Sequence, residues 1–351
     1  MTAQPLGATM TAGQTVTPLS RARDLCRSAW GIDGRLVPFA SERDEIFRVD
    51  AADGRCFALK LTSPAEDAVA TDFQTAALLH TAERAPDLPI PHLVPDRGGR
   101  VAFRPDWPGE AVPIARLLTW LEGQPLASAP RTVEQARSMG AALAKLGAAL
   151  ADFDHAGAEH DLAWNLENAA RVRALLASIE GEDRRALVEM AMDRFEATTA
   201  VAMAGLRRQV VHNDLNPHNT LVAHGAPYPL TGMIDFGDLV RTALAADVAI
   251  AACYLISEGK EAMRLPHALV GEYHRHRPLN EAELALIAPM MAARHLVTVA
   301  ITEWRAARYP ENRAYITKNT ATAWHGLSIL ATRPMEAWTE GFLAISNKGR
   351  G

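Results

Sequence analysis

The 351-residue chain has an ordinary globular composition, with 48% hydrophobic and 22% charged residues, and is long enough for two domains with a core each. This composition excludes a mainly disordered chain. The formal net charge of −5 argues against a general nucleic-acid binder, which normally carries a basic excess. We therefore expect small molecules or proteins as partners, and no nucleic acid.

The three cysteines, Cys26, Cys56 and Cys253, are odd in number and far apart, and no CxxC pair occurs. The sequence therefore predicts neither a disulfide framework nor a zinc module, and a cytoplasmic location fits best. Residues 1–20 lack the basic and apolar segments of a signal peptide, so we interpret them as a flexible leader. The most apolar helical run, residues 244–256, is too short to span a membrane, which predicts no membrane partner.

The first part of the chain has the pattern of short strands, with apolar runs separated by turns. EIFRV and RCFALKL are joined by DAADG, a hairpin connection in which Gly54 accommodates a positive φ. In the second strand, the two-residue period puts the larger apolar side chains on one face and Lys60 on the other. Residues 68–85 are predicted to form one helix, and GGRVAF and AVPIARLLTW supply further strands. We predict that residues 21–120 form a β-rich lobe, to which the family resemblance described below assigns nucleotide binding.

The remaining residues, 121–351, change to alanine- and leucine-rich segments with a helical period. Further helices are predicted over residues 168–179 and 183–204, and over most of the chain from residue 244. The core stripe of a long helix is indicated by apolar residues that step by four, three, four and three positions: Met139, Leu143, Leu146, Leu150 and Phe153. The fold class is therefore α+β, with a small β-rich lobe and a large helical lobe.

Polar groups are crowded into VVHNDLNPHNTLV, residues 210–222, where the proline and the asparagines predict an ordered loop rather than a helix. Asn219 follows Asp214 by five positions, and Asp235 comes at the end of the next predicted strand, LTGMI. Such a set suits phosphoryl transfer, because Asp214 can accept a hydroxyl proton while Asn219 and Asp235 hold Mg²⁺ against ATP. In an isolated HxD sequence, the His and Asp side chains more often cap backbone groups of a turn. The spacing to Asn219, together with IDFGD, favours catalysis instead.

The sequence resembles the aminoglycoside phosphotransferase and choline kinase-like enzymes, which share the protein kinase-like fold. HNDLNPHN is similar to their H-x-D-x-x-x-x-N catalytic loop, and IDFGD to their metal-binding motif. FDHAGAEHDLAWNLENA, IDFGDLVRTALAADVAIAACY and WRAARYPENRAYI resemble the hydroxylysine kinase-like subgroup. The resemblance covers residues 36–330 and implies a two-lobed kinase that uses ATP and Mg²⁺.

The resemblance also implies roles for individual residues. Asp214 matches the catalytic base, and His212 a residue that braces the catalytic loop. Asn219 and Asp235 match the magnesium ligands. Lys60 matches the lysine that contacts the α- and β-phosphates of ATP. Asp247 matches a buried acid that holds the backbone of the catalytic loop. The backbone of the connector from Thr119 to Leu121 would bind adenine.

Two parts of the nucleotide site depart from the family pattern. The expected phosphate-covering loop, PFASERDE, has no glycine, so Ser41 is a weak candidate for phosphate contacts. The helix residue nearest the expected partner of Lys60 is Gln74, with Asp72 as the nearby acid, and a Lys60–Gln74 contact would be a hydrogen bond rather than an ion pair.

The acceptor is expected to be a small molecule with a hydroxyl group. Asp235 and Asp247 are only twelve positions apart, too close for the long segment that presents a protein substrate to a protein kinase. Hydroxylysine-like amino acids rank first by resemblance, ahead of homoserine, ethanolamine, choline and aminoglycosides. The alternative of another class is a nucleotide-binding pseudokinase that regulates a partner, and the intact catalytic residues count against it.

Four residues are candidates for acceptor binding, and each also has a structural interpretation. Asp161 and Trp164 belong either to the acceptor site or to surface turns and packing, and the ring of Trp164 suits an ammonium group. Arg294 lies in an apolar helix, where it binds either an acceptor carboxylate or an internal carboxylate. Asp238 is similarly open.

Overall fold

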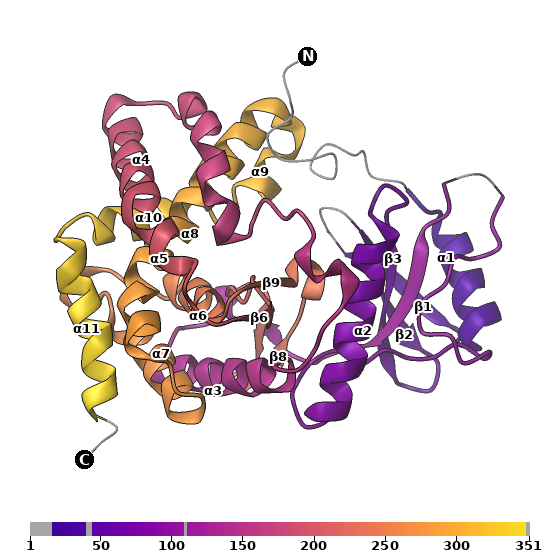
Figure 1. The fold of residues 1–351 in the computed structure, drawn as a ribbon. Coiled ribbons are helices and arrows are strands. Elements are labelled where there is room, and N and C mark those ends of the chain that lie inside the picture. Colours follow the sequence, from indigo (N-terminus) through magenta and orange to yellow (C-terminus); the bar gives the residue numbers. More distant parts are fainter. Residues whose placement is uncertain (1–15, 40–43, 109–110, 349–351) are drawn as a thin grey trace. The chain divides into compact units, whose positions relative to one another are not determined.

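The computed structural model describes residues 16–39, 44–108 and 111–348, which form two compact units. The first unit takes the chain up to Glu122 and two later segments, residues 154–160 and 232–234. The second unit holds the rest of the chain. The sequence placed the division after residue 120 but did not predict that two later segments join the first unit. Figure 1 shows the elements of both units along the chain.

The first unit is built on a four-stranded antiparallel sheet with the order β1-β2-β3-β4. The β2–β3 hairpin and its turn are as predicted, because Gly54 has a φ of 87°. The elements of this unit are α1 (Leu19–Leu25), the π-helical η2 (Cys26–Trp30), β1 (Gly34–Phe39), β2 (Glu45–Ala51), β3 (Cys56–Thr62), α2 (Ala68–Arg84), β4 (Ile114–Thr119) and the 3₁₀ turn η4 (Ala156–Glu159).

The two faces of this sheet have different environments, as the two-residue period predicted. One face carries the apolar core, in which α1 and η2 pack against Phe47, Leu59 and neighbouring side chains. On the other face, Lys60 lies opposite Arg116 in the β3–β4 register. Arg116 donates hydrogen bonds to α2, which therefore covers that second face.

The predicted end of the leader at residue 20 and one predicted strand of the N-terminal part were wrong. The predicted leader overlaps α1, which begins at Leu19, and Thr17 donates hydrogen bonds to Glu45 through both its backbone N–H and its hydroxyl. Residues 1–15 of that leader lie outside the described residues. GGRVAF forms no strand, because only Phe103 pairs with the sheet, through an isolated bridge to Ala115.

The second unit is mostly helical, with short strands that flank the polar loop. The three-stranded sheet has the order β5-β7-β8, and β6 pairs with β9. The strands are β5 (Gln124–Pro125), β6 (Arg208–Val211), β7 (Thr220–Val222), β8 (Leu230–Met233) and β9 (Val240–Ala243), and the last two residues of β8 belong to the first unit. The helices are η3 (Leu126–Ser128), α3 (Val133–Ala149), η5 (Leu166–Ser178), α4 (Glu182–Arg194), η6 (Phe195–Thr199), α5 (Ala200–Met203), η7 (Phe236–Asp238), α6 (Leu244–Cys253), η8 (Gly259–Glu261), α7 (Arg264–His276), α8 (Glu281–Arg308), η9 (Pro310–Asn312), α9 (Arg313–Ile316), α10 (Thr320–Leu330) and α11 (Met335–Lys348).

Helix α3 confirms the predicted long helix and its core stripe. Thr132 and Gln135 form a capping box that satisfies two backbone N–H groups at its first turn. All five residues of the predicted stripe are buried, although Leu150 and Phe153 lie just beyond the last helical residue.

Helix α8 is the central helix of the second unit and contacts α6, α10 and α11. It is the one helix in the described part of the chain that is long and apolar enough to cross a membrane, but 78% of its most apolar window is buried inside the protein. Burial of that kind is typical of the core helix of a globular domain.

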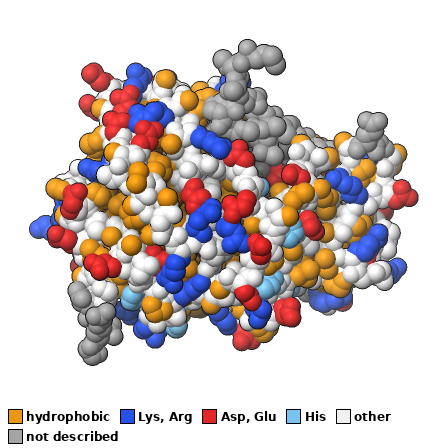
Figure 2. All heavy atoms as spheres, viewed as in Figure 1, with side chains coloured by type: hydrophobic (Ala, Val, Ile, Leu, Met, Phe, Trp, Pro, Cys, Tyr) orange, Lys and Arg blue, Asp and Glu red, His pale blue; other side chains and the backbone are white. Residues whose placement is uncertain are grey.

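The surface carries charges of both signs. On the face shown in Figure 2, Lys and Arg side chains lie among Asp and Glu side chains.

Candidate active site

The polar loop is an ordered turn between two short strands, as predicted. β6 ends at Val211, directly before His212, and β7 begins at Thr220, directly after Asn219. The side chain of Asn216 shapes the loop, because its Oδ1 accepts the backbone N–H of His218 at 2.8 Å and that of Asn219 at 3.3 Å. An asparagine that bonds backbone groups two residues on replaces the regular hydrogen bonds that a helix would supply.

Asp214 is held by hydrogen bonds to both of its carboxylate oxygens. Asn219 donates its Nδ2 to Asp214 Oδ2 at 2.7 Å and to the Asp214 carbonyl at 2.9 Å. Asn216 donates to the same Oδ2 at 3.0 Å. Arg294 donates to the other oxygen, Oδ1, at 2.7 Å. The prediction that Asp214 and Asn219 act together is therefore consistent with the geometry, while the roles of Asn216 and Arg294 at this carboxylate were not predicted.

The backbone before Asp214 is supported from α6 and by a buried ring. Asp247 is buried and accepts the backbone N–H of Asn213 at 2.7 Å, which matches its predicted role. Asn213 has a φ of 64°, a left-handed conformation that persists only where the surroundings hold it. His212 is fully buried, with its ring 4.8 Å from that of Phe236. Its Nδ1 accepts the backbone N–H of Asp214 at 3.3 Å, so the predicted bracing role is also consistent with the structure.

Asp235 follows β8 and begins the short turn η7. Like Asn213, it has a φ of 64°, and its side chain accepts the backbone N–H of Gly237 at 3.2 Å. Burial raises the pKa of Asp214 to about 7, against the opposing charge of Arg294. The charges of Asp238 and Asp235 raise the pKa of Asp214 further, which places both carboxylates near the proposed base.

The residues predicted as magnesium ligands fit a divalent cation that also binds phosphate oxygens. The described residues contain no group of three His, Cys, Asp or Glu side chains that could hold a metal alone. Mg²⁺ does not require one, because it usually takes one or two protein oxygens together with phosphates and water. The amide nitrogen of Asn219 is committed to Asp214, so its Oδ1 is the atom left for a cation. Asp235 is exposed and supplies a carboxylate.

The predicted nucleotide residues of the first unit have partners that the sequence did not indicate. Lys60 forms an ion pair with Asp44, with 2.7 Å between Nζ and Oδ2, and both side chains are about 15% exposed (16% and 15%). Gln74 accepts a hydrogen bond from Arg116 at 3.2 Å. The partner of Lys60, which the sequence left open, is therefore Asp44. Ser41, the weak candidate for phosphate contacts, lies outside the described residues.

Two of the three backbone N–H groups in the connector at the end of β4 donate hydrogen bonds to other backbone carbonyls. Thr119 donates to the carbonyl of His92 at 2.8 Å, and Trp120 donates to that of Cys56 at 3.2 Å. In the described residues the N–H of Leu121 has no such partner. Of the connector that was predicted to bind adenine, Leu121 is thus the residue with a donor to offer.

Of the four acceptor candidates, Arg294 contacts Asp214 and Trp164 contacts Arg294, which changes their interpretation. Arg294 is buried and pairs with Asp214, which is the internal salt bridge that the sequence left open. Its guanidinium carbon also lies 5.2 Å from the ring centroid of Trp164. Asp161 forms an exposed ion pair with Arg171, which is typical of a surface contact.

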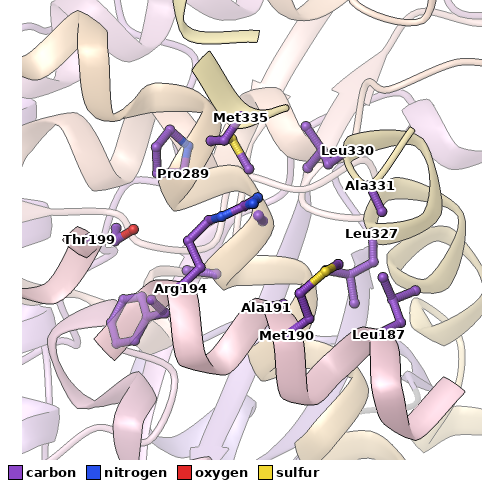
Figure 3. Close-up of a pocket in the computed structure, with 13 residues that line it drawn as sticks. Leu187, Met190, Ala191, Arg194, Thr199, Pro289, Leu327, Leu330, Ala331 and Met335 are labelled. Carbon is purple, nitrogen blue, oxygen red and sulfur yellow. The ribbon is translucent and has the colours of Figure 1, made fainter. Parts of the chain in front are cut away.

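A separate apolar pocket lies among α4, η6, α8, α10 and the start of α11 (Figure 3). Leu187, Met190 and Leu327 are among the side chains that line it, and Arg194 is the charged residue of the lining. None of the predicted catalytic residues lines it, so this pocket is not the candidate active site.

Comparison with known proteins identifies the family. A family model described as phosphotransferase enzyme family matches residues 35–281, which is more than half of the 351-residue chain. The chain belongs to this family. Hydroxylysine kinase from Mus musculus is 24% identical over 334 residues, which cover 89% of this chain and 88% of that protein.

Solved structures of kinases share the fold of this phosphotransferase. A microcompartment-associated aminopropanol kinase has a TM-score of 0.70 at 17% identity, over 93% of this chain and 100% of that chain. An amicoumacin kinase in complex with AMP-PNP, Ca²⁺ and Ami has a TM-score of 0.64 at 14% identity, over 87% of this chain and 94% of that chain. The predicted family and α+β, protein kinase-like fold are thereby confirmed, and the chain is a small-molecule phosphotransferase.

Proposed function

We propose that this phosphotransferase moves the γ-phosphate of ATP to the hydroxyl group of a small amino acid or amino alcohol, with a hydroxylysine-like acceptor favoured. The observation that carries the proposal is the Asp214 carboxylate, which is held on both oxygens in a loop of the H-x-D-x-x-x-x-N type. A kinase solved with AMP-PNP shares the fold, which supports ATP as the phosphate donor.

Each residue of the proposed mechanism acts on a defined group. Asp214 accepts the proton of the acceptor hydroxyl, whose oxygen forms the new bond to phosphorus as the bond to the ADP oxygen breaks. Lys60 binds the α- and β-phosphates, and the N–H of Leu121 binds adenine. Asn219 Oδ1 and the carboxylate of Asp235 would hold Mg²⁺, which neutralises the charge that develops on the phosphates.

The charges around Asp214 support an acceptor with an amino group. Asp235 and Asp238 contribute negative charge at the proposed base, while the buried cation that contacts the base, Arg294, is already paired with Asp214. A cationic acceptor is therefore favoured over an anionic one. The half-buried ring of Trp164, beside Arg294, is the aromatic surface proposed for the ammonium group. The relationship to hydroxylysine kinase ranks that acceptor class first.

The test is ADP release from ATP in the presence of Mg²⁺ and a panel of hydroxylysine, homoserine, ethanolamine, choline and aminoglycosides. We expect turnover with an amino-acid acceptor in the parent protein, and its loss in Asp214→Asn with ATP binding retained. ATP binding without turnover of any acceptor would instead favour the regulatory pseudokinase. Phosphorylation of a generic protein would overturn the small-molecule acceptor.

A further inference from the structure

Arg294 contacts the proposed base directly, although it lies 80 residues from it in sequence. We propose that Arg294 is a positioning residue that fixes the Asp214 carboxylate for catalysis, an inference that rests on the proposed function of Asp214 as the base. The acceptor hydroxyl would then approach Asp214 at Oδ1.

The guanidinium of Arg294 is anchored at three of its nitrogen atoms. NH2 donates to Asp214 Oδ1 at 2.7 Å, NH1 to the backbone carbonyl of Trp164 at 3.1 Å, and Nε to the hydroxyl of Tyr254 at 3.2 Å. The arginine is 2% exposed, so water does not compete for these bonds. A planar group with three anchors has one orientation, which it imposes on the carboxylate that it contacts.

The anchors of Arg294 are themselves fixed. The hydroxyl of Tyr254 lies 3.4 Å from that of Thr298, which donates to the carbonyl of Arg294 one helical turn earlier at 2.8 Å. Trp164 supplies both its carbonyl and its ring, 5.2 Å from the guanidinium carbon. Arg294 is thus held by two other elements of the second unit before it contacts Asp214.

The hydrogen bonds leave the two carboxylate oxygens unequal. Oδ2 accepts from Asn216 and from Asn219, which fills its two lone pairs. In the described residues Oδ1 accepts from Arg294 alone, so one of its lone pairs is open to a hydroxyl. The three bonds prevent rotation of the carboxylate, and this open lone pair therefore points in one fixed direction. Such a fixed orientation lowers the barrier because the base needs no rearrangement when the acceptor binds.

Substitution by lysine tests positioning, because lysine keeps the charge but cannot reach three partners at once. In Arg294→Lys we expect kcat to fall by about 100-fold, the loss typical of a catalytic group displaced by about 1 Å. The KM for ATP should stay within about threefold of that of the parent, and kcat should fall by more than the KM for the acceptor rises, because Arg294 contacts the proposed acceptor segment through Trp164 alone. In Arg294→Ala, added guanidinium ion at millimolar concentration should restore part of kcat.

Arg207→Lys is the matched control. Arg207 also lies in the second unit, where it donates to the buried carboxylate of Glu283 and to the carbonyl of Pro278. Its substitution should lower the thermal midpoint and leave kcat unchanged. Guanidinium ion should not raise the kcat of Arg207→Ala.

Three results would overturn the inference. The first is a kcat of Arg294→Lys equal to that of the parent. The second is a loss of kcat no larger than the fraction of protein that the lowered thermal midpoint leaves unfolded. The third is a raised KM for the acceptor at unchanged kcat, which would make Arg294 an acceptor ligand. Failure of the proposed function is recognised separately, because the parent protein would then turn over no acceptor of the panel. In that case ADP release with water as the acceptor provides the same comparison of kcat among the variants.

Discussion

Acid should destabilise this phosphotransferase through His295, the residue next to Arg294 in α8. The side chain of His295 is fully buried, with its ring 6.1 Å from that of Tyr254 and against Gly326 of α10. Burial lowers the pKa of His295 from 6.5 to about 3, and the nearby charges of Arg294 and His325 act in the same direction. The backbone of Cys253 opposes this shift of the His295 pKa without cancelling it.

The sign follows from which state takes up the proton. The folded pKa lies below the unfolded pKa, so the unfolded chain binds a proton first as the pH falls through about 6.5. Stability is therefore full above that pH and is lost as the pH falls toward 3. Between pH values of about 7.5 and 5, one such group costs ~2 kcal/mol of unfolding free energy. This figure depends mainly on the unfolded pKa, because at pH 5 the folded histidine is still almost entirely neutral.

The assay is urea unfolding at the two pH values, for the parent protein and for His295→Gln. Glutamine does not gain a proton in this range, so the fall in unfolding free energy on acidification should be smaller by ~2 kcal/mol in the variant. His224→Gln, at an exposed position between β7 and β8, serves as the control and should keep the parental difference. Equal pH dependence of the parent and His295→Gln would refute the reasoning.

Three further substitutions have outcomes set by single contacts. Asp247→Ala should lower the unfolding free energy by about 1–3 kcal/mol, because the buried N–H of Asn213 loses its acceptor, and a thermal midpoint equal to that of the parent would contradict this. Gly140→Ala should cost about 1–3 kcal/mol in urea unfolding, since a Cβ there would lie 2.2 Å from the carbonyl oxygen of Leu269. Lys60→Met should raise the KM for ATP by about 10- to 100-fold through loss of a charge-assisted contact to phosphate, and an unchanged KM would remove Lys60 from the site.

Local patterns predicted the elements well where one period dominated. The β2–β3 hairpin, α2 and α3 follow from alternation, from a glycine turn and from a helical stripe. The segment predicted as a helix over residues 168–179 is the 3₁₀ helix η5, and its buried residues Leu166, Ala169, Val172 and Leu175 recur every three positions. That spacing is the period of a 3₁₀ helix, so the signal was present but was assigned to the commoner type of helix.

The contacts that complete the site were harder to predict because they join distant segments. His212, Asp214 and Asn219 form a local motif, and the spacing of Asp214 and Asn219 was enough to suggest the chemistry that we propose for them. The ion pair of Lys60 with Asp44 joins β3 to the residue directly before β2, and no period in the sequence encodes such a contact. Arg294 was correctly singled out as a charge in an apolar helix, but its partner could not be chosen without the packing of α8.

The division between local and distant contacts has a consequence for acceptor specificity. Asn216 and Asn219 reach Asp214 from two and five residues away, so the loop fixes one oxygen of the proposed base by itself. The other oxygen is fixed from α8, and Arg294 in turn contacts Trp164, on the segment proposed to bind the acceptor. A change in that segment can therefore alter the acceptor without disturbing Asn219 and Asp235, the proposed metal ligands, but it acts on the proposed base through Arg294. Acceptor choice and the orientation of the base are expected to be coupled in this protein, so substitutions at Trp164 should change kcat as well as the KM for the acceptor.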